Sequence, residues 1–199
     1  MKILTQKRIH TLSWFTLITA MVICLPLLFG LTETQAAWNG TAANRFSSGT
    51  GTEADPYLIR SESHMGYFIS QLNEGINFEG SYIQLDADPD MTGHPWTYPY
   101  AASFAGTFIG NAHTVETDGT LLPDIAASGV VTGLNVEAKT TVTRAILCDY
   151  NHGLIQMCCM RGDVVDDSSD IAGMICAENN GSVQYCGAVG SISANGSSV

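Results

Sequence analysis

The chain has 199 residues, of which 45% are hydrophobic and only 14% charged, with 20 glycines and a formal net charge of −11. Few charged residues among many Gly, Ser, Thr and Asn favour a β-rich, turn-rich fold over a helical one. The acidic charge repels phosphate backbones and anionic lipids, so we expect no nucleic-acid partner and no attraction to a membrane surface.

Residues 1–36 have the pattern of a secretory signal peptide. Basic residues begin the chain, an apolar run follows from Leu12 to Leu31, and small residues stand at Ala36 and Ala37. The pattern predicts a secreted or cell-surface protein with five basic and 18 acidic residues after cleavage, a net charge of −13.

Two other fates of this segment stay open. The apolar run reaches the roughly 20 residues needed to cross a bilayer, so an uncleaved anchor, the chain's one membrane contact, is the alternative to cleavage. A lipid on Cys24 is a third reading, which the large Ile23 before it disfavours.

Residues 37–103 are expected to form a lead-in and an N-terminal cap. Residues 38–52 are rich in Gly, Ser, Thr and Asn and predict a loop, whereas residues 55–59 and 81–86 predict short strands. A short helix is predicted over residues 61–74. Its signals are a capping Ser61, a terminating Gly75 and four apolar residues at helical spacing, which are Met65, Phe68, Ile69 and Leu72.

An internal repeat dominates the rest of the chain. Residues 144–165 align without a gap on residues 172–193, at an offset of 28, with six identities in 22 positions. The identical pairs are Cys148/Cys176, Asn151/Asn179, Gly153/Gly181, Gln156/Gln184, Cys158/Cys186 and Gly162/Gly190. A weaker copy at residues 129–131 aligns Gly129 with Gly153 at an offset of 24.

The repeat predicts an all-β chain, a right-handed parallel β-helix over residues 104–199 with a short N-terminal capping helix. Each copy holds short apolar strands separated by Gly or Asn corners, and such units bury a core only by stacking in register. An antiparallel sandwich also uses short strands, but it does not require register between copies. A further copy would begin at position 200, so we expect the array to be incomplete at its C-terminus.

Three segments resemble large bacterial surface proteins. Residues 49–59, GTGTEADPYLI, resemble the "GTG-T-x-x-x-P-Y-x-I" segment that opens their β-helices. Residues 104–115, FAGTFIGNAHTV, resemble their "F-x-G-x-F-D-G-N-G-H-x-I" segment, with Ile109 in place of Asp and Ala112 in place of Gly. The two repeat copies resemble GLUG-type repeats. The resemblance implies a secreted or wall-attached adhesin-like protein and carries no catalytic residue onto this chain.

The chain has two acidic segments, and one of them has the spacing of a cation site. Asp86, Asp88 and Asp90 alternate as in a calcium loop, but the Glu that an EF-hand needs at its twelfth position is missing, so an acidic surface turn is the simpler interpretation. A second acidic group is predicted to be a solvated loop between strands; it contains Asp163, Asp166, Asp167 and Asp170. We expect no cofactor and no metal, apart from this weak calcium possibility.

Five cysteines remain after signal cleavage, an odd number. Cys148 and Cys176 share one repeat position and Cys158 and Cys186 another, so each pair is expected to stack one coil apart. Cys packs as a small hydrophobic residue, which favours free, buried thiols. A disulfide between adjacent coils is the alternative, provided that the Cβ vectors converge.

The sequence therefore predicts an exported structural or adhesion module that binds a surface ligand, a glycan or a host protein, without catalysis. One alternative is the N-terminal part of a carbohydrate-active β-helix enzyme or of a surface peptidase. The other is a stalk that spaces further domains from the cell. An exposed stripe of aromatic side chains or of stacked carboxylates on one coil face would favour glycan binding or the enzyme, and a plain polar surface would favour the stalk.

Overall fold

The computed structural model describes residues 38–94, 101–166 and 171–194, which belong to a compact unit spanning Gln35–Val199. The predicted signal peptide, residues 1–36 with Cys24, lies outside the described residues. Within the described ranges, no helix has both the length and the apolar character needed to span a membrane.

The described residues form one helix and 13 strands. The helix is α2 (Glu62–Asn73), and the strands of the first half are β1 (Tyr57–Ile59), β2 (Tyr82–Leu85), β3 (Thr107–Ile109), β4 (Thr114–Thr117), β5 (Val130–Thr132), β6 (Asn135–Ala138) and β7 (Val142–Thr143). The second half contains β8 (Cys148–Asn151), β9 (Leu154–Gln156), β10 (Cys159–Asp166), β11 (Cys176–Asn179), β12 (Ser182–Gln184) and β13 (Gly187–Ala194).

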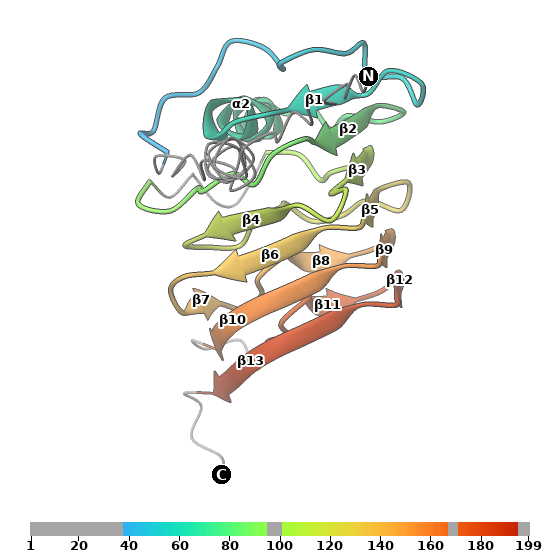
Figure 1. The fold of residues 1–199 in the computed structure, drawn as a ribbon. Helices are drawn as coiled ribbons and strands as arrows, with labels where there is room; N and C mark the ends of the chain where they lie inside the picture. The colour runs from blue at the N-terminus through green and yellow to red at the C-terminus, as the bar shows by residue number, and fades with distance from the viewer. Residues whose placement is uncertain (1–37, 95–100, 167–170, 195–199) are drawn as a thin grey trace, which may run out of the picture. The chain divides into compact units, whose positions relative to one another are not determined.

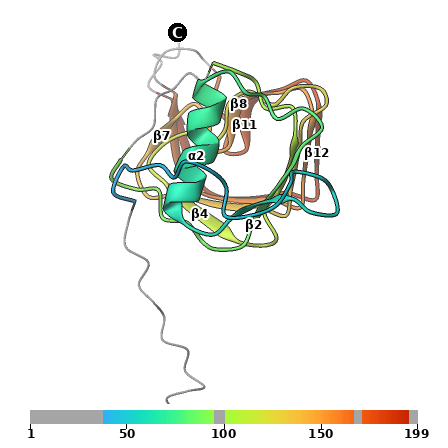
Figure 2. The same ribbon diagram turned by 90° about the horizontal axis from the view of Figure 1, so that it is seen from above.

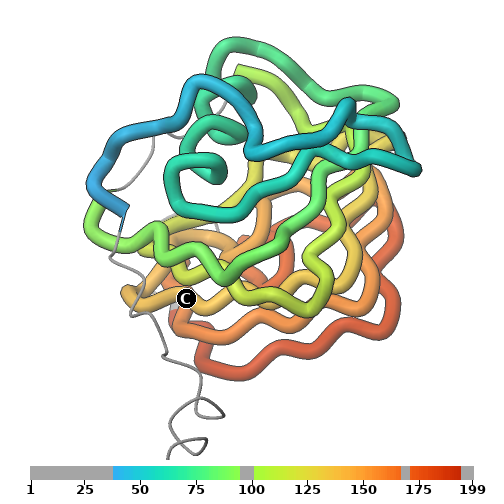
Figure 3. Tube along the Cα trace, turned by 45° about the horizontal axis from the view of Figure 1, so that its top comes forward, coloured from blue at the N-terminus to red at the C-terminus, as the bar shows by residue number. Residues whose placement is uncertain are grey.

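These strands stack as a right-handed parallel β-helix of about five turns, as the sequence predicts. The first sheet has the order β1-β2-β3-β5-β9-β12, the second β4-β6-β10-β13 with β7 beside β10, and the third pairs β8 with β11. All pairs between these strands are parallel, and successive coils descend in chain order from β1 to β13 (Figures 1 and 3).

The register of the two repeat copies is confirmed. Cys148 pairs with Cys176, Ile155 with Val183 and Gly162 with Gly190, each at the offset of 28. The weaker copy is confirmed as well, because Val131 pairs with Ile155 at the offset of 24. The fold therefore places equivalent residues in columns, one coil above another.

These columns make the core. In the first sheet Ile83, Phe108, Val131 and Ile155 lie directly above one another and are fully buried. Apolar side chains at such column positions pack at the inter-strand spacing of about 4.8 Å, which excludes water along the whole axis. Burial is incomplete only in the coil made by β11, β12 and β13, which we call the terminal coil.

Helix α2 covers the N-terminal end of the column (Figure 2). Its N-cap is Ser61, whose Oγ accepts a hydrogen bond from the backbone N of His64, and it ends just before Gly75, whose φ is +90°. Its four predicted apolar residues are all buried, and the ring of Phe68 lies 5.1–5.8 Å from the rings of Phe78, Phe104 and Phe108. The prediction of a capping helix over residues 61–74 is confirmed.

The corner after β3 contains Ala112, which stands where the surface-protein segment that the sequence resembles has glycine. This corner takes residues 110–113, two more than the equivalent corner after β5, so the offset between coils falls from 23 before it to 21 after it. Asn111 and Ala112 both adopt positive φ, at 52° and 63°, and Ala112 N donates to the carbonyl of Gly133. A glycine at position 112 would adopt this conformation at lower cost.

The predicted solvated loop at the second acidic group is wrong for the residues that the structure describes. Asp163 and Asp166 belong to β10, and Asp166 is buried. Strand β10 continues this far because β7 and β13 pair with it on its two sides, as Val142 and Ile192 do with Val164. Asp167 and Asp170 lie outside the described residues.

Candidate binding groove

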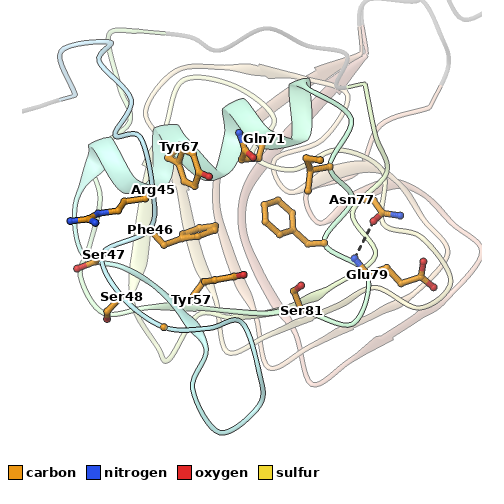
Figure 4. A pocket seen from close by; sticks show the side chains of 13 residues that line it. Arg45, Phe46, Ser47, Ser48, Tyr57, Tyr67, Gln71, Asn77, Glu79 and Ser81 are labelled. Carbon is orange, nitrogen blue, oxygen red and sulfur yellow. Dashed lines mark hydrogen bonds between the residues drawn. The ribbon is translucent and has the colours of Figure 1, made fainter.

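A groove of about 710 Å³ lies at the capped end of the β-helix, between the lead-in, β1, α2 and the loop that joins α2 to β2 (Figure 4). Three half-buried aromatic rings line it, those of Phe46, Tyr57 and Tyr67. Each ring comes from a different segment, so the groove exists only once the lead-in has docked on the helix and on β1.

Backbone hydrogen bonds hold the lead-in in place. Ser47 N donates to the Leu58 carbonyl at 3.0 Å, and Leu58 N donates to the Ser48 carbonyl at 2.9 Å. This pairing also covers the free edge of β1. Gly49 follows at φ +96°, where an added Cβ would collide with the Pro56 carbonyl, so the close approach requires glycine.

The rings are arranged around Phe46. Its ring stacks on Tyr57 with centroids 4.6 Å apart and an interplanar angle of 12°, and it meets Tyr67 edge to face at 5.1 Å. The buried ring of Phe78 also packs against Phe46, with the two ring centroids 6.0 Å apart. Packed on one another in this way, the rings lose little side-chain entropy when a ligand binds.

Polar side chains surround the aromatic floor. Arg45 and Glu79 are exposed, whereas Gln71 is half-buried and donates to Glu74 Oε2 at 3.0 Å. Asn77 Oδ1 accepts from the backbone N of Glu79 at 3.1 Å, which leaves its amide nitrogen available for a ligand. The groove thus combines apolar ring surface with planar hydrogen-bonding groups, the pattern of a small-ligand or glycan site.

The three aspartates of the predicted acidic turn, the weak calcium candidates, each contact different residues. Asp86 pairs with Arg60 at 2.7 Å, and Asp90 Oδ1 accepts from the N and Oγ1 of Thr92. Asp88 accepts from the backbone N of Thr114 at 2.7 Å and lies 3.0 Å from His113 Nδ1. Within the part of the chain that the structure describes, no three acidic, His or Cys side chains are grouped to hold a metal ion.

The asparagines and glycines that the two repeat copies share hold successive coils in register. Asn151 is fully buried and its Nδ2 donates to Asn179 Oδ1 at 2.7 Å, so the two amides form the start of a ladder. Gly153 and Gly181 lie in one column, where a Cβ on either would strike the carbonyl of the glycine one coil earlier. Gly162 and Gly190 share a second column with φ near +145° (141° and 149°), and Gly162 sits inside β10 in the tripeptide Arg161-Gly162-Asp163.

All five described cysteines are free thiols. Burial raises the pKa of Cys148 well above its ordinary value and that of Cys158 to about 11, while the pKa of Cys176 is also raised. Cys158 Sγ donates to the Gln156 carbonyl at 3.1 Å. These three thiols therefore stay protonated at neutral pH and pack as apolar side chains. Cys159 instead lines a shallow surface depression with Asn135 and Arg161.

Sequence reasoning missed one charged cluster. Arg144 Nη1 lies 3.3 Å from Asp149 Oδ2, and Asp149 is buried. Burial raises the pKa of nearby Asp124, the backbone N of Tyr150 lowers it, and the charge of Asp149 raises it again. Asp149 and Asp124 are separated by 25 positions in the sequence, so only the coil register reveals that their charges interact.

The two large sheets present different outer faces. In the first sheet the outward residues of β2, β3, β5, β9 and β12 carry no charge: Tyr82, Gln84, Thr107, Ile109, Val130, Thr132, Leu154, Gln156, Ser182 and Gln184. The second sheet carries an ion-pair row, in which Lys139 Nζ lies 2.9 Å from Glu116 and 2.8 Å from Glu137. The acidic charge of the chain is thus kept away from one flat face.

The groove was also not predicted from the sequence. The sequence predicts a strand at Tyr57, but nothing in the spacing of Phe46, Tyr57 and Tyr67 indicates that their rings meet. The one available signal was the lead-in motif itself, because its glycines only make sense if residues 47–51 pass close to another segment. No protein-family model matches the chain, and searches of curated proteins and of solved structures returned no match.

Proposed function

We propose that this protein is an exported binding module whose ligand, an uncharged glycan segment, occupies the groove formed by Phe46, Tyr57 and Tyr67. The observation that carries the proposal is the groove itself, a concave site of about 710 Å³ in which packed aromatic rings meet planar polar side chains. The rest of the β-helix acts as the rigid support that holds these segments together.

Two features favour a glycan without charge. Sugar rings place C–H groups on aromatic faces and hydroxyls toward amide, guanidinium and carboxylate groups, which the groove supplies in Gln71, Arg45 and Glu79. The net charge of −11 repels polyanionic glycans at any distance within the screening length. Rigid support by the β-helix keeps the entropic cost of binding low.

Binding without catalysis fits the composition of the groove. Glycoside hydrolysis uses a pair of carboxylates on either side of the scissile bond. Among the described residues that line the groove, Glu79 is the one acidic side chain. The Asp124 and Asp149 cluster is a weaker candidate for catalysis, because Asp149 is buried and paired with Arg144.

A location outside the cell is part of the proposal. Its support is the pattern of residues 1–36, with basic residues, an apolar run and small residues before the expected cleavage point. The thiol-rich core is compatible with export, because the four columnar thiols are buried or half-buried and carry raised pKa values where shifts are resolved.

Glycan-array screening followed by calorimetry on the best hit tests the proposal. Tyr67→Ala and Arg45→Ala are expected to weaken binding about tenfold or more, because each removes a side chain that faces the groove. Tyr185→Ala and Arg161→Ala are the matched controls, since these exposed side chains lie on coils away from the cap and should leave binding unchanged.

Four outcomes would contradict the proposal. Binding that survives both groove variants would place the ligand elsewhere, for example on the uncharged face of the first sheet. Binding of host proteins but of no glycan would favour a protein ligand. No binding to either class would favour the spacer stalk, and release of reducing sugar ends would favour the enzyme.

A further inference from the structure

We infer that the glycan bound in the groove contains an N-acetylated amino sugar, whose acetamido group contacts Gln71, Ile76 and Asn77. The inference rests on the proposed function and names the class of sugar that the same groove selects. These three residues line the groove where the C-terminal end of α2 meets the loop that joins α2 to β2.

Two side-chain amides present hydrogen-bonding atoms of fixed identity. Gln71 Nε2 donates to the Glu74 carboxylate at 3.0 Å, and an ionised carboxylate only accepts, so Gln71 Oε1 is left as an acceptor. Asn77 Oδ1 accepts from the backbone N of Glu79 at 3.1 Å, so Asn77 Nδ2 is left as a donor (Figure 4). The wall of the groove thus offers a ligand one acceptor and one donor, each set by a neighbouring residue.

An acetamido group matches this pair of atoms. Its N–H donates and its carbonyl oxygen accepts, and the two roles are not exchangeable, whereas a sugar hydroxyl rotates and takes either role. Its methyl group is stabilised when it leaves water for an apolar surface. Ile76 offers such a surface, because it lines the groove beside Asn77 and is 48% exposed.

The loop after α2 is held in place before any ligand binds. Ile76 N donates to the Gln71 carbonyl at 2.9 Å, which keeps these two residues next to each other. Ala105 N donates to the Asn77 carbonyl at 2.8 Å, and the following residue, Phe78, is buried. Few groups are therefore ordered on binding, and the entropic cost of recognising the acetamido group is low.

The charges in the groove favour the acetylated form of such a sugar. Without its acetyl group, an amino sugar is a cation at neutral pH and needs negative charge nearby to be held. Among the described residues that line the groove, Arg45 and Glu79 are the charged ones, and their charges cancel. An uncharged acetamido group, in contrast, needs the two amides and the apolar contact that the wall supplies.

Calorimetry of the exported chain with three matched tetrasaccharides tests the inference. N-acetylchitotetraose and cellotetraose share one linkage and differ at the carbon next to the anomeric carbon, which carries an acetamido group in the first and a hydroxyl in the second. We expect N-acetylchitotetraose to bind about tenfold more tightly, because it adds two hydrogen bonds and a methyl contact. De-N-acetylated chitotetraose should bind less tightly than the acetylated form at physiological ionic strength, where the general attraction of an acidic protein is screened.

Two variants locate the preference in the groove wall. Asn77→Asp keeps the acceptor for Glu79 N and loses the donor, so it should remove most of the preference for N-acetylchitotetraose and change cellotetraose binding by less than about threefold. Ile76→Ser should reduce the same preference severalfold. Asn73→Asp is the matched control, since it makes the same chemical change on α2 outside the residues that line the groove and should leave both affinities unchanged.

The outcomes separate this inference from the proposed function. Equal affinity for N-acetylchitotetraose and cellotetraose, weakened for both by Tyr67→Ala, would overturn the inference and leave the proposed function standing. A preference that survives both Asn77→Asp and Ile76→Ser would also overturn it, as would tightest binding of the de-N-acetylated sugar, which would indicate recognition of charge. Binding of none of the three would overturn the inference too, and the glycan array would then decide on the proposed function alone.

Discussion

At the scale of single residues, carbonyl oxygens and glycine hydrogens set the distance between successive coils. Gly106, Gly129, Gly153 and Gly181 follow one another in a column, and an added Cβ at each of the last three would press on the carbonyl of a residue one coil earlier. The contact is with backbone, which cannot move aside as a flexible side chain does. Register between coils therefore depends on these positions as much as on the apolar columns.

Gly153→Ala tests this dependence. The added methyl group would collide with the Gly129 and Ala126 carbonyls, so the free energy of unfolding should fall by about 2 kcal/mol or more. Gly119→Ala is the control, because nothing lies within 4 Å of a Cβ built there. Urea unfolding should show a change within about 0.5 kcal/mol for the control. Equal midpoints for the two variants would contradict the column.

The buried thiols predict a pH dependence. The pKa of Cys158 is about 11 in the fold against 9.0 for a free thiol, so folding favours the protonated form. This contribution is complete below pH 9 and is lost as the pH rises toward 11, at most about 3 kcal/mol. Urea unfolding between pH 8 and about pH 11 should therefore show a weaker pH dependence for Cys158→Ala than for the unchanged chain. Cys159→Ala is the control and should retain the full dependence, since its thiol lies in a surface depression.

At the scale of elements, the cap covers the apolar interior and the unpaired strand edge that a stacked fold would otherwise expose at its N-terminal end. Helix α2 closes the first coil with a face of buried apolar residues, and the lead-in pairs with β1 on the edge that would otherwise stay open. Phe68 is the centre of this cap, since its ring contacts aromatic rings from three later segments. The groove depends on the same packing.

Phe68→Ala is expected to loosen the cap as a unit. Loss of a fully buried phenylalanine leaves a cavity and should lower the free energy of unfolding by about 3–5 kcal/mol. Asn73→Ala, at the C-terminal end of the same helix, should change it by less than about 1 kcal/mol. Amide hydrogens in α2 and β1 should exchange faster in the Phe68 variant. Unchanged exchange there would show that Phe68 does not hold the cap together.

The sequence predicted those elements whose signals lie within a short stretch of the chain. The helix and the two repeat copies were predicted correctly, because capping residues, helical spacing and the offset of 28 are each visible within a short window. The extent of β10 was not, because Asp163 and Asp166 are held in the strand by neighbours from other coils. The groove and the Asp124–Asp149 interaction were missed for the same reason, since their members come together only through stacking.

At the scale of the whole molecule, stability should vary along the axis, because each coil contacts only its neighbours. The middle coils are covered on both sides, the first is covered by α2, and the terminal coil is covered on one side by β8, β9 and β10. Local opening costs least where fewest apolar groups are buried, and burial declines from β10 to β13.

This gradient has a direct consequence for amide exchange. In dilute solution the amides of β12 and β13 should exchange much faster than those of β9 and β10, even though the paired strands have the same register. Strands β3 and β5, which are paired on both sides, serve as the internal reference. Uniform protection along the axis would contradict stepwise opening from the terminal coil.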